Sequence, residues 1–600
     1  MKKFFKRLLK ITGVLLLILL VFIGIVYYQS VNYDTYSLKA DKSNFSSTED
    51  LGMLAKELVS QMTLEEKIDQ MYGEKRLTSM PKFIINILAK KRFPHVYVGR
   101  NERLNLPPWV LSDGPRGARV LGKGIDAVTT FPVAMARGAS WDVSLERRVN
   151  EVISKEIRAN GANYAATPCI NLLRHPGWGR AQETYGEDPW HLGEFGVAAV
   201  QGIEANNVMA CPKHFALNSI ENSRWVVNVK VDERTLREVY LPHFKKVIQK
   251  GKPASIMSAY NQVRGQFAGS NKELLTDILR NDWGFEGFVS TDWVYGLYDG
   301  VAGVKAGLDV EMPWQNAYSY ETLQGGIESG EITEEDIDKL VIRSLKTRLK
   351  YALIDDEDQF PADLILDKSH IELAKEAAEK SMVLVKNEDV LPFSKANGQK
   401  IAVIGRLANV ENTGDHGSSD SNPPYVVTPY EGIKDYHEAL GNEVILDDGS
   451  DVDRAAEIAT SADQVVVVVG YTYVDEGEYI IFNRDQMQAS ANAGKLIGER
   501  GEGGDRSDLR LNPADEALIK AIAAKSKNVV VTYVGGSAID MAAWEDEVPA
   551  ILFSWYSGME GGNALANILY GEVNPSGKLP FSIAENANNY PKFNPYIDEI

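Results

Sequence analysis

The chain alternates short apolar runs with amphipathic segments from about residue 50 onward. Apolar positions at helical spacing predict helices over Leu145–Asn160, His191–Asn206, Glu233–Gln249 and Asn271–Asn281. Apolar runs of strand length lie around these helices, at 109–113, 164–173, 208–214, 254–260, 287–293 and 306–313. Strands that alternate with helices form parallel sheets joined by crossover helices, so we predict an α/β fold for this half of the chain.

A second series of apolar runs lies at 400–405, 443–448, 464–470, 528–535 and 550–555. These runs are rich in β-branched residues, which is typical of strands buried on both faces of a parallel sheet. Amphipathic segments separate them, and we therefore expect an open three-layer α/β sandwich. Glycines follow several of the runs, but no complete dinucleotide-binding motif is present, so no cofactor is expected.

The first 30 residues have the pattern of a membrane signal. Five basic residues within 1–10 precede an uncharged apolar stretch at 11–28. That stretch reaches the lower length limit of a transmembrane helix, and the basic residues favour a cytoplasmic N-terminus. We expect an uncleaved signal anchor in the cell membrane, with the domains that follow outside the cytoplasm. Secretion after cleavage is the alternative, although residues 27–30 offer no small-residue cleavage site.

Composition excludes some classes of protein. The 600 residues are 44% hydrophobic and 24% charged, as in ordinary globular proteins. The formal net charge of −19 disfavours nucleic acid as a partner, because no basic field is available to displace phosphate counterions. The only cysteines, Cys169 and Cys211, lie in apolar runs and are expected to be buried free thiols.

Polar residues stand at the carboxyl ends of the apolar runs in the first half, namely Asp113, His214, Tyr260, Asp292, Asp309 and Glu311. In a (β/α)₈ barrel these strand ends converge on one active site. Residues that merely begin loops would explain one or two of the six. We therefore predict a signal anchor at 1–30, a stalk at 31–49, a (β/α)₈-type barrel at 50–355, a linker at 356–385 and an α/β sandwich at 386–600.

The expected site combines carboxylates, cations and aromatic rings. Carboxylate pairs beside hydrogen-bonding side chains suit glycosidic cleavage, in which one carboxylate attacks and another protonates the leaving oxygen. Trp178, Trp293 and Trp314 offer ring faces on which a sugar can stack. No metal-ligand spacing is present, so no metal is expected. A lyase or aldolase that uses Lys213 as a Schiff base stays open on this evidence alone.

Ordered segments sharpen this interpretation: SDGPRGAR at 112–119, HPGWGRAQETYGEDP at 175–189, CPKHFALNSIENSR at 211–224, GFVSTDW at 287–293 and SGMEGGNALANILYGEVNPSGKLPFS at 557–582. With these segments the chain from 50 to 600 resembles glycoside hydrolase family 3. The resemblance implies a retaining, exo-acting β-glycosidase, most often a β-glucosidase, which hydrolyses terminal β-linked glycosyl residues. Many such sequences continue into a fibronectin-like domain, so truncation at the C-terminus is one interpretation of this chain.

The resemblance also implies site residues. It places the catalytic nucleophile on Asp292 and the sugar-binding positions on Asp113, Arg180, Lys213, His214, Met257, Tyr260 and Trp293. Two structural alternatives stay open. Lys213 and His214 would form ion pairs with Glu187 or Asp188, and Trp293 would be a core residue.

The proton donor is expected on a loop of the second domain. Glu476 is the first choice, because it follows the strand at 464–470 and stands in a Glu-Gly turn; Glu502 and Glu478 are the alternatives. Such an acid needs a raised pKa and hence partial desolvation against the barrel. The alternatives for function are a β-xylosidase, a glycoside phosphorylase and, in a different class, an inactive carbohydrate-binding surface protein.

Overall fold

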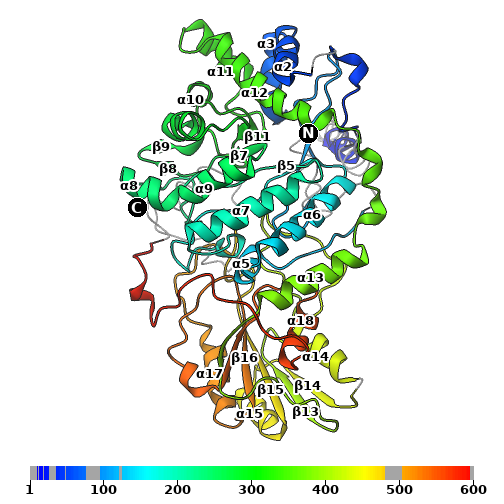
Figure 1. Cartoon of the computed structure of the whole chain (residues 1–600), viewed down its shortest axis with the longest axis vertical. Helices are drawn as coiled ribbons and strands as arrows, with labels where there is room; N and C mark the ends of the chain where they lie inside the picture. Colours follow the sequence, from blue (N-terminus) through cyan, green and yellow to red (C-terminus); the bar gives the residue numbers. More distant parts are fainter. Residues whose placement is uncertain are drawn as a thin grey trace, which may run out of the picture.

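The computed structural model describes residues 10, 12–17, 19–25, 36–46, 49–75, 95–119, 125–438, 440–479 and 503–594. Figure 1 shows two lobes stacked along the long axis, with blue-to-green segments in the upper lobe and yellow-to-red segments mainly in the lower one. Each lobe has its own large apolar core, and the barrel core includes Phe131, Leu279 and Leu345, whereas the lower core includes Val467 and Phe553.

The upper lobe is a (β/α)₈-like barrel, as predicted. Its strands are β1 (Tyr72–Glu74), β2 (Val96–Val98), β3 (Trp109–Ser112), β4 (Tyr164–Ala165), β5 (Met209–Ala210), β7 (Ser255–Met257), β10 (Phe288–Ser290) and β11 (Glu311–Trp314). Parallel ladders join β3 to β4, β4 to β5, β7 to β10 and β11 to β1. Single parallel bridges, Phe215 to Ser258 and Ser290 to Val310, connect these ladders beyond the strand ends.

One strand departs from the predicted parallel arrangement. β2 runs antiparallel to β3, with Val96 opposite Leu111 and Val98 opposite Trp109. Only residues 99–108 join the two strands, and this stretch contains no helix. A parallel pair needs a crossover of a dozen or more residues, so this short connection forces the chain to turn back on itself.

The predicted helices are present. α6 (Val143–Ala159) and α7 (Pro189–Glu204) pack on each other outside the barrel, and each begins at an aspartate that accepts a backbone N–H bond from the first turn. The helix predicted over 233–249 is divided at Leu241, because Pro242 starts a new helical segment and has no N–H to donate. The segment expected over 271–281 is the π-helix η6 (Glu273–Asp282).

The lower lobe is the predicted α/β sandwich. Its sheet has the order β12-β17-β16-β15-β13-β14, and only β12 (Val383–Asn387) runs antiparallel to its neighbour β17 (Ala550–Phe553). The inner strands β13 (Lys400–Ile404), β15 (Gln464–Gly470) and β16 (Val529–Val534) are buried apart from Lys400, which fits their β-branched composition. β14 (Glu443–Asp447) forms one edge and β12 the other. In Figure 1 helices α15 (Val452–Ser461) and α17 (Pro513–Ala523) lie on the opposite side of the sheet from α14 (Pro429–Glu438) and α18 (Gly561–Leu569).

The connection between the lobes also packs. α13 (Lys368–Ser381) contacts α5 (Ala134–Ala139) and α6 of the barrel, as well as α18 of the sandwich. Three loop segments of the sandwich domain, at 405–428, 471–479 and 503–512, contact the barrel. The ends of the barrel strands and of the sandwich strands therefore meet at one junction.

The predicted transmembrane helix at 11–28 is not confirmed. The described residues 12–17 and 19–25 are helical and exposed, with Leu17 62% accessible. In the part of the chain that is described, no helix combines the length and the apolarity needed to cross a bilayer.

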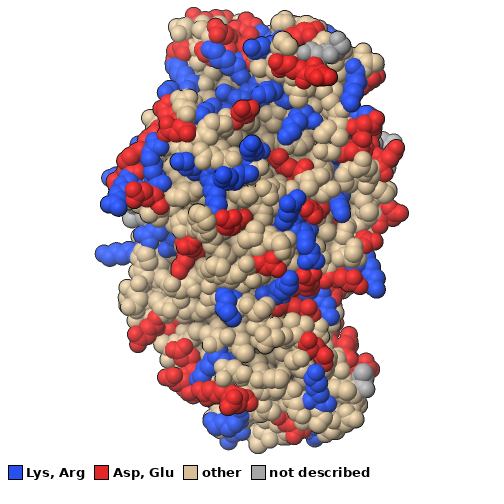
Figure 2. Space-filling model, in the orientation of Figure 1, with Lys and Arg blue, Asp and Glu red and all other residues tan. Residues whose placement is uncertain are grey.

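On the face drawn in Figure 2, acidic and basic side chains are interspersed over both lobes.

Candidate active site

Asp292 lies just beyond the carboxyl end of β10 at the junction of the lobes, and only 6% of its surface is exposed. Its Oδ1 accepts the backbone N–H of Trp293 at 2.7 Å. Its Oδ2 is buried without a hydrogen-bond partner among the described residues. Burial raises the pKa of Asp292 to about 6, against the opposing effect of Arg224 and Arg180. Burial thus leaves one carboxylate oxygen of Asp292 without a hydrogen bond from the described part of the chain.

Lys213 and Asp113 form a second charged pair at the carboxyl ends of the barrel strands, in which the lysine is buried and the aspartate partly buried. They follow β5 and β3, and Lys213 Nζ lies 2.9 Å from Asp113 Oδ1. Burial opposes the charge on Lys213, but Asp113 outweighs it, so the pKa of the lysine is raised. The structural alternative, an ion pair with Glu187 or Asp188, is not what the structure shows for Lys213, which pairs with Asp113; Asp188 caps α7, and Glu187 accepts bonds from Ser582.

His214 is a neutral hydrogen-bonding group in this site. Asn171 Oδ1 accepts from Nδ1 at 3.1 Å, while Arg180 Nη1 donates to Nε2 at 3.2 Å. Burial, with the nearby cations Arg180, Lys213 and Arg224, lowers the pKa of His214 well below its usual value. The imidazole therefore orients Arg180 and does not neutralise a carboxylate.

Arg180 connects the barrel to the second domain. Its guanidinium makes a bidentate pair with Glu183 at 2.8 and 2.7 Å, which leaves Nη1 directed at His214 and, at 3.6 Å, at Glu478. It is almost completely buried, as expected for an arginine that is fully paired.

Aromatic side chains form one wall of the site. Tyr260, Trp225 and Tyr479 pack together, with Trp293 half-buried against them, and the Tyr260 hydroxyl donates to the carbonyl of Trp293 at 2.7 Å. Met257, at the end of β7, is buried in the barrel core next to Trp293. Trp293 thus contacts both the core and the site wall, so the core-packing alternative is partly right.

Four residues singled out in the sequence have structural roles instead. Asp309 is enclosed by Arg280 and Arg343 at 2.6 and 2.7 Å, and Glu311 accepts three backbone N–H bonds from residues 316–318. Trp178 and Trp314 are buried and offer no free ring face. Both cysteines are buried free thiols, as predicted.

Glu476 does not lie in this site. Its Oε1 accepts bonds from the Gly536 N–H at 2.7 Å and the Tyr556 hydroxyl at 2.9 Å, and its Oε2 lies 3.0 Å from Arg506 Nε. Burial raises its pKa, against the effect of Arg506. These side-chain partners all belong to the sandwich domain. The turn after β15 therefore directs the Glu476 side chain into its own domain and not towards the barrel. Glu502, the second choice from the sequence, lies outside the described residues.

Glu478, two residues farther along, is the carboxylate that reaches the barrel. Its Oε1 accepts from Arg224 Nη1 at 3.1 Å and lies 3.6 Å from Arg180 Nη1, while Oε2 accepts the Ser418 N–H at 2.6 Å. Burial opposes its ionisation, but Arg180 and Arg224 outweigh burial and lower its pKa well below the usual range. Sequence reasoning missed Arg224, although it ends the segment 211–224 that carries Lys213 and His214.

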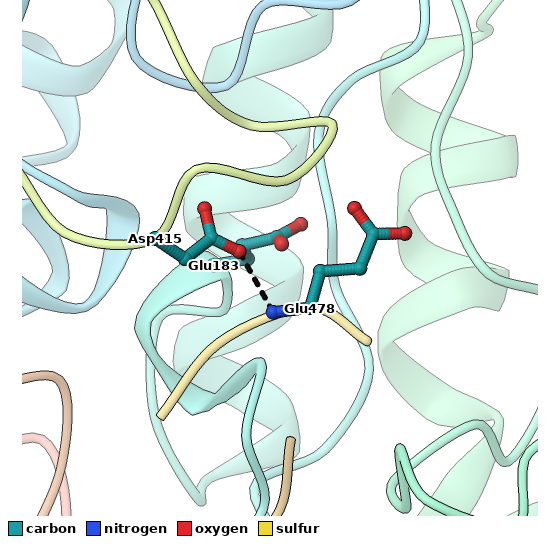
Figure 3. Close-up of side chains that lie close together, drawn as sticks. All are labelled: Glu183, Asp415 and Glu478. Carbon is teal, nitrogen blue, oxygen red and sulfur yellow. Dashed lines mark hydrogen bonds between the residues drawn. The ribbon is translucent and has the colours of Figure 1, made fainter. Parts of the chain in front are cut away.

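Glu478 also belongs to a cluster of three carboxylates with Glu183 and Asp415 (Figure 3), whose nearest oxygens lie within 4.8 Å of one another. Figure 3 shows the Glu478 carboxylate turned away from Asp415, which instead accepts the Glu478 N–H at 2.9 Å. Arg180 occupies both oxygens of Glu183, and Ser419 donates to Asp415 at 2.5 Å. These donors account for the proximity of the three acids, and the cluster supports no metal assignment.

Comparison with known proteins identifies the fold and the family. The glycosyl hydrolase family 3 N-terminal domain matches residues 96–347, and the glycosyl hydrolase family 3 C-terminal domain matches residues 382–599. The structure of β-glucosidase 3B from Thermotoga neapolitana in complex with glucose is similar with a TM-score of 0.77 and 28% identity, over 91% of this chain and 79% of that one.

Curated relatives agree. Thermostable β-glucosidase B from Acetivibrio thermocellus is 33% identical over 90% of this chain and 67% of its own length. β-Glucosidase BoGH3A from Bacteroides ovatus is 31% identical over 94% of this chain and 76% of its own length. An exo-α-(1→6)-L-arabinopyranosidase from Bifidobacterium breve is 32% identical, and there the chain spans 64% of the relative. The predicted resemblance is therefore confirmed, and the chain belongs to glycoside hydrolase family 3.

Proposed function

We propose that this chain is a retaining, exo-acting β-glucosidase in which Asp292 is the nucleophile. The observation that carries the proposal is Asp292 Oδ2, which is buried without a hydrogen-bond partner among the described residues. It lies 3.6 Å from His214 Nε2, and Arg224 and Arg180 act on its charge. Side chains that donate and accept hydrogen bonds converge there with an aromatic wall, which is the arrangement that recognises a pyranose.

In the first step Asp292 Oδ2 attacks the anomeric carbon and the glycosidic bond breaks, while a protonated carboxyl group gives its proton to the leaving oxygen. The product is a glycosyl ester on Asp292 and a free alcohol. In the second step the carboxyl group that donated the proton, now ionised, takes a proton from water, and the oxygen of that water attacks the anomeric carbon. The ester bond breaks and Asp292 is regenerated.

We propose Glu478, in place of Glu476, as that second carboxyl group. Among the described acids of loop 471–479, it is the one that contacts the arginines of the barrel site. Arg180 and Arg224 hold it ionised in the unliganded site, which is the form that the second step needs. For the first step, sugar hydroxyls that share the Arg180 donors weaken this ion pairing and allow Glu478 to bind a proton.

Glucose is the proposed sugar because β-glucosidases predominate among the similar proteins, including structures in complex with glucose. A β-xylosidase is the second candidate, because the probable β-D-xylosidase 7 from Arabidopsis thaliana is 30% identical over 88% of this chain. Hydrolysis of p-nitrophenyl β-glucoside, β-xyloside and α-L-arabinopyranoside by residues 31–600 ranks these sugars directly. Unchanged products on addition of phosphate would argue against a phosphorylase.

Asp292→Ala provides the test of the mechanism. We expect the variant to retain its fold and to lose the hydrolysis of every aryl glycoside. Near-normal turnover would contradict the assignment of Asp292, and absence of turnover in the wild-type protein would favour an inactive binding protein.

We propose an extracytoplasmic location on the basis of the five basic residues within 1–10 and the uncharged stretch that follows. Protease protection of the full chain in spheroplasts tests this. Accessibility of the barrel from outside is the expected result, and protection until lysis would contradict it.

A further inference from the structure

A single carboxylate joins the two domains beside the active site. Asp505 belongs to the loop that leaves the sandwich domain, and its side chain is buried against the barrel. Its Oδ1 accepts the backbone N–H groups of Gly179 and Glu221 at 2.9 and 3.1 Å. Its Oδ2 accepts those of Glu221 and Asn222, both at 2.9 Å. One side chain of the second domain therefore orders two separate loops of the first.

A hydrogen bond also runs in the opposite direction, from the Asp505 loop to a side chain of the barrel. The side chain of Asn222 accepts the backbone N–H of Asp505 at 3.0 Å, so the two loops hold each other. The next residue extends the attachment, because the Arg506 N–H donates to the Gly177 carbonyl at 2.8 Å and its guanidinium donates to the Pro176 carbonyl at 2.8 Å.

Close packing makes this attachment rigid. A Cβ atom on Gly179 would lie 2.3 Å from the Gly504 carbonyl oxygen and 2.5 Å from that of Gly477. The backbones of the two domains thus meet without room for a side chain. Gly504 also donates its N–H to the Gly477 carbonyl at 3.1 Å, which ties the Asp505 loop to the loop that carries Glu478.

Both barrel loops held by Asp505 carry a site arginine. Gly179 directly precedes Arg180, and Glu221 pairs with Arg224 at 2.9 Å. Those arginines lie 3.6 and 3.1 Å from Glu478 Oε1, and Arg224 also donates to the Tyr479 carbonyl at 2.6 Å. Asp505 itself contacts none of these guanidinium groups by hydrogen bond or ion pair among the described residues.

We propose that Asp505 is a positioning residue that sets Arg180 and Arg224 against Glu478 across the domain boundary, so that proton transfer to the leaving group depends on it. The proposal rests on the proposed function of Glu478 as the proton donor. Three N–H groups donate to this carboxylate, that of Glu221 to both oxygens, and they fix the two oxygens in direction as well as in distance. An asparagine at 505 keeps the volume but presents an NH₂ group to two of the donors.

Asp505→Asn is tested on two aryl β-glucosides, one with the activated dinitrophenolate leaving group and one with phenolate. If proton transfer is impaired, kcat for the phenyl glucoside falls by about 10²-fold, whereas the dinitrophenyl glucoside, which needs little acid assistance, loses less than about fivefold. A purely structural defect lowers both by the same factor. Equal losses, or unchanged kinetics, would overturn the proposal.

Asp515→Asn is the matched control. Asp515 is likewise a buried aspartate of the second domain, paired with Arg406 Nε at 3.2 Å, and it makes no hydrogen bond or ion pair with the described barrel loops. We expect both substrates to be hydrolysed within about twofold of the wild-type rate. A leaving-group dependence in this control would show that the readout does not isolate the Asp505 contact.

Asn222→Ala removes the reciprocal bond from the barrel side and covers the case in which a variant at 505 fails to fold. It should show the same leaving-group dependence as Asp505→Asn, with a smaller loss. Uniform kinetics in a folded Asn222→Ala protein would count against the proposal. Hydrolysis of the dinitrophenyl glucoside by the wild-type enzyme tests the proposed function separately, and Glu478→Ala shows whether Glu478 is the group being positioned.

Discussion

Asp292 Oδ2 faces His214 Nε2 at 3.6 Å, and both atoms are hydrogen-bond acceptors. The imidazole uses its Nδ1–H for Asn171 and accepts a bond from Arg180 at Nε2. Neither of the two facing atoms donates a proton to the other in this arrangement, so the contact does not fix the orientation of the Asp292 carboxylate. In the proposed mechanism, this absence of a hydrogen bond from the described residues is the physical reason why Oδ2 is available for attack on the substrate.

Activity should require ionised Asp292. Burial raises its pKa to about 6, so the protonated fraction grows as the pH falls through that value. We expect kcat/KM for an aryl glucoside to decline below about pH 6, with an acid limb that reports the free enzyme. A pH profile from about 4 to 9 measures this limb. A limb below about pH 5 would show that the site holds Asp292 ionised more strongly than its burial suggests.

Asp292→Asn should stabilise the fold at neutral pH. The native pKa of about 6 exceeds the ordinary value of 3.8, so ionisation at pH 7 costs the folded state free energy that the unfolded chain does not lose. The difference of about two pKa units corresponds to about 3 kcal/mol above pH 6, and it vanishes below about pH 4, where both states are protonated. Thermal unfolding of both proteins at pH 8 and pH 4 measures the effect; an equal difference in Tm at the two pH values would contradict it.

The proton donor should be revealed by a panel of three alanine variants. Glu478→Ala should lose about 10²–10⁴-fold in kcat for poor leaving groups but much less for activated aryl glucosides. Azide should restore its turnover and yield the β-glucosyl azide. Glu476→Ala should instead be destabilised without leaving-group dependence, because it loses the bonds to Gly536 and Tyr556. Azide rescue of Glu502→Ala alone would transfer the role to Glu502.

Lys213→Gln should weaken sugar binding in both the ground state and the transition state. The substitution removes a buried cation and leaves Asp113 without its partner at 2.9 Å. A charged hydrogen bond contributes roughly 1.5–3 kcal/mol, so kcat/KM should fall about 10–10²-fold or more. Lys245→Gln on the exposed side of α9 (Pro242–Lys246) is the control and should leave the kinetics unchanged. An unaltered KM in Lys213→Gln would remove this residue from the glycone site.

Much of the fold could be predicted because its determinants are local. The periodicity that predicts helices over 145–160 and 191–206 gives α6 and α7, and the β-branched run at 464–470 gives a completely buried strand. The antiparallel strand β2 could not be predicted in the same way. Its direction follows from a connection too short for a crossover, and the sequence pattern of β2 itself is the same in either direction.

In the candidate site, too, some residues could be predicted from the local sequence and others only from the packing. Strand-end positions placed Asp113, His214, Tyr260 and Asp292 near one another, because the carboxyl ends of barrel strands converge whatever the loops do. The same rule misassigned Asp309, since only the packing of α12 (Glu334–Ala352) against the barrel brings Arg343 to it.

The sequence by itself determined the family and the two α/β domains, because motifs and periodicity record short-range constraints, and it singled out Asp292, which we propose as the nucleophile. Only the tertiary structure separates the surroundings of Glu476 from those of Glu478, and our proposal of Glu478 as the proton donor rests on that difference. They are two residues apart on one loop, and their chemistry is alike. Their contacts differ because one side chain turns into the sandwich domain towards Arg506 while the other crosses to Arg180 and Arg224. That choice depends on contacts between segments about 250 or more residues apart in the chain, which no local pattern encodes.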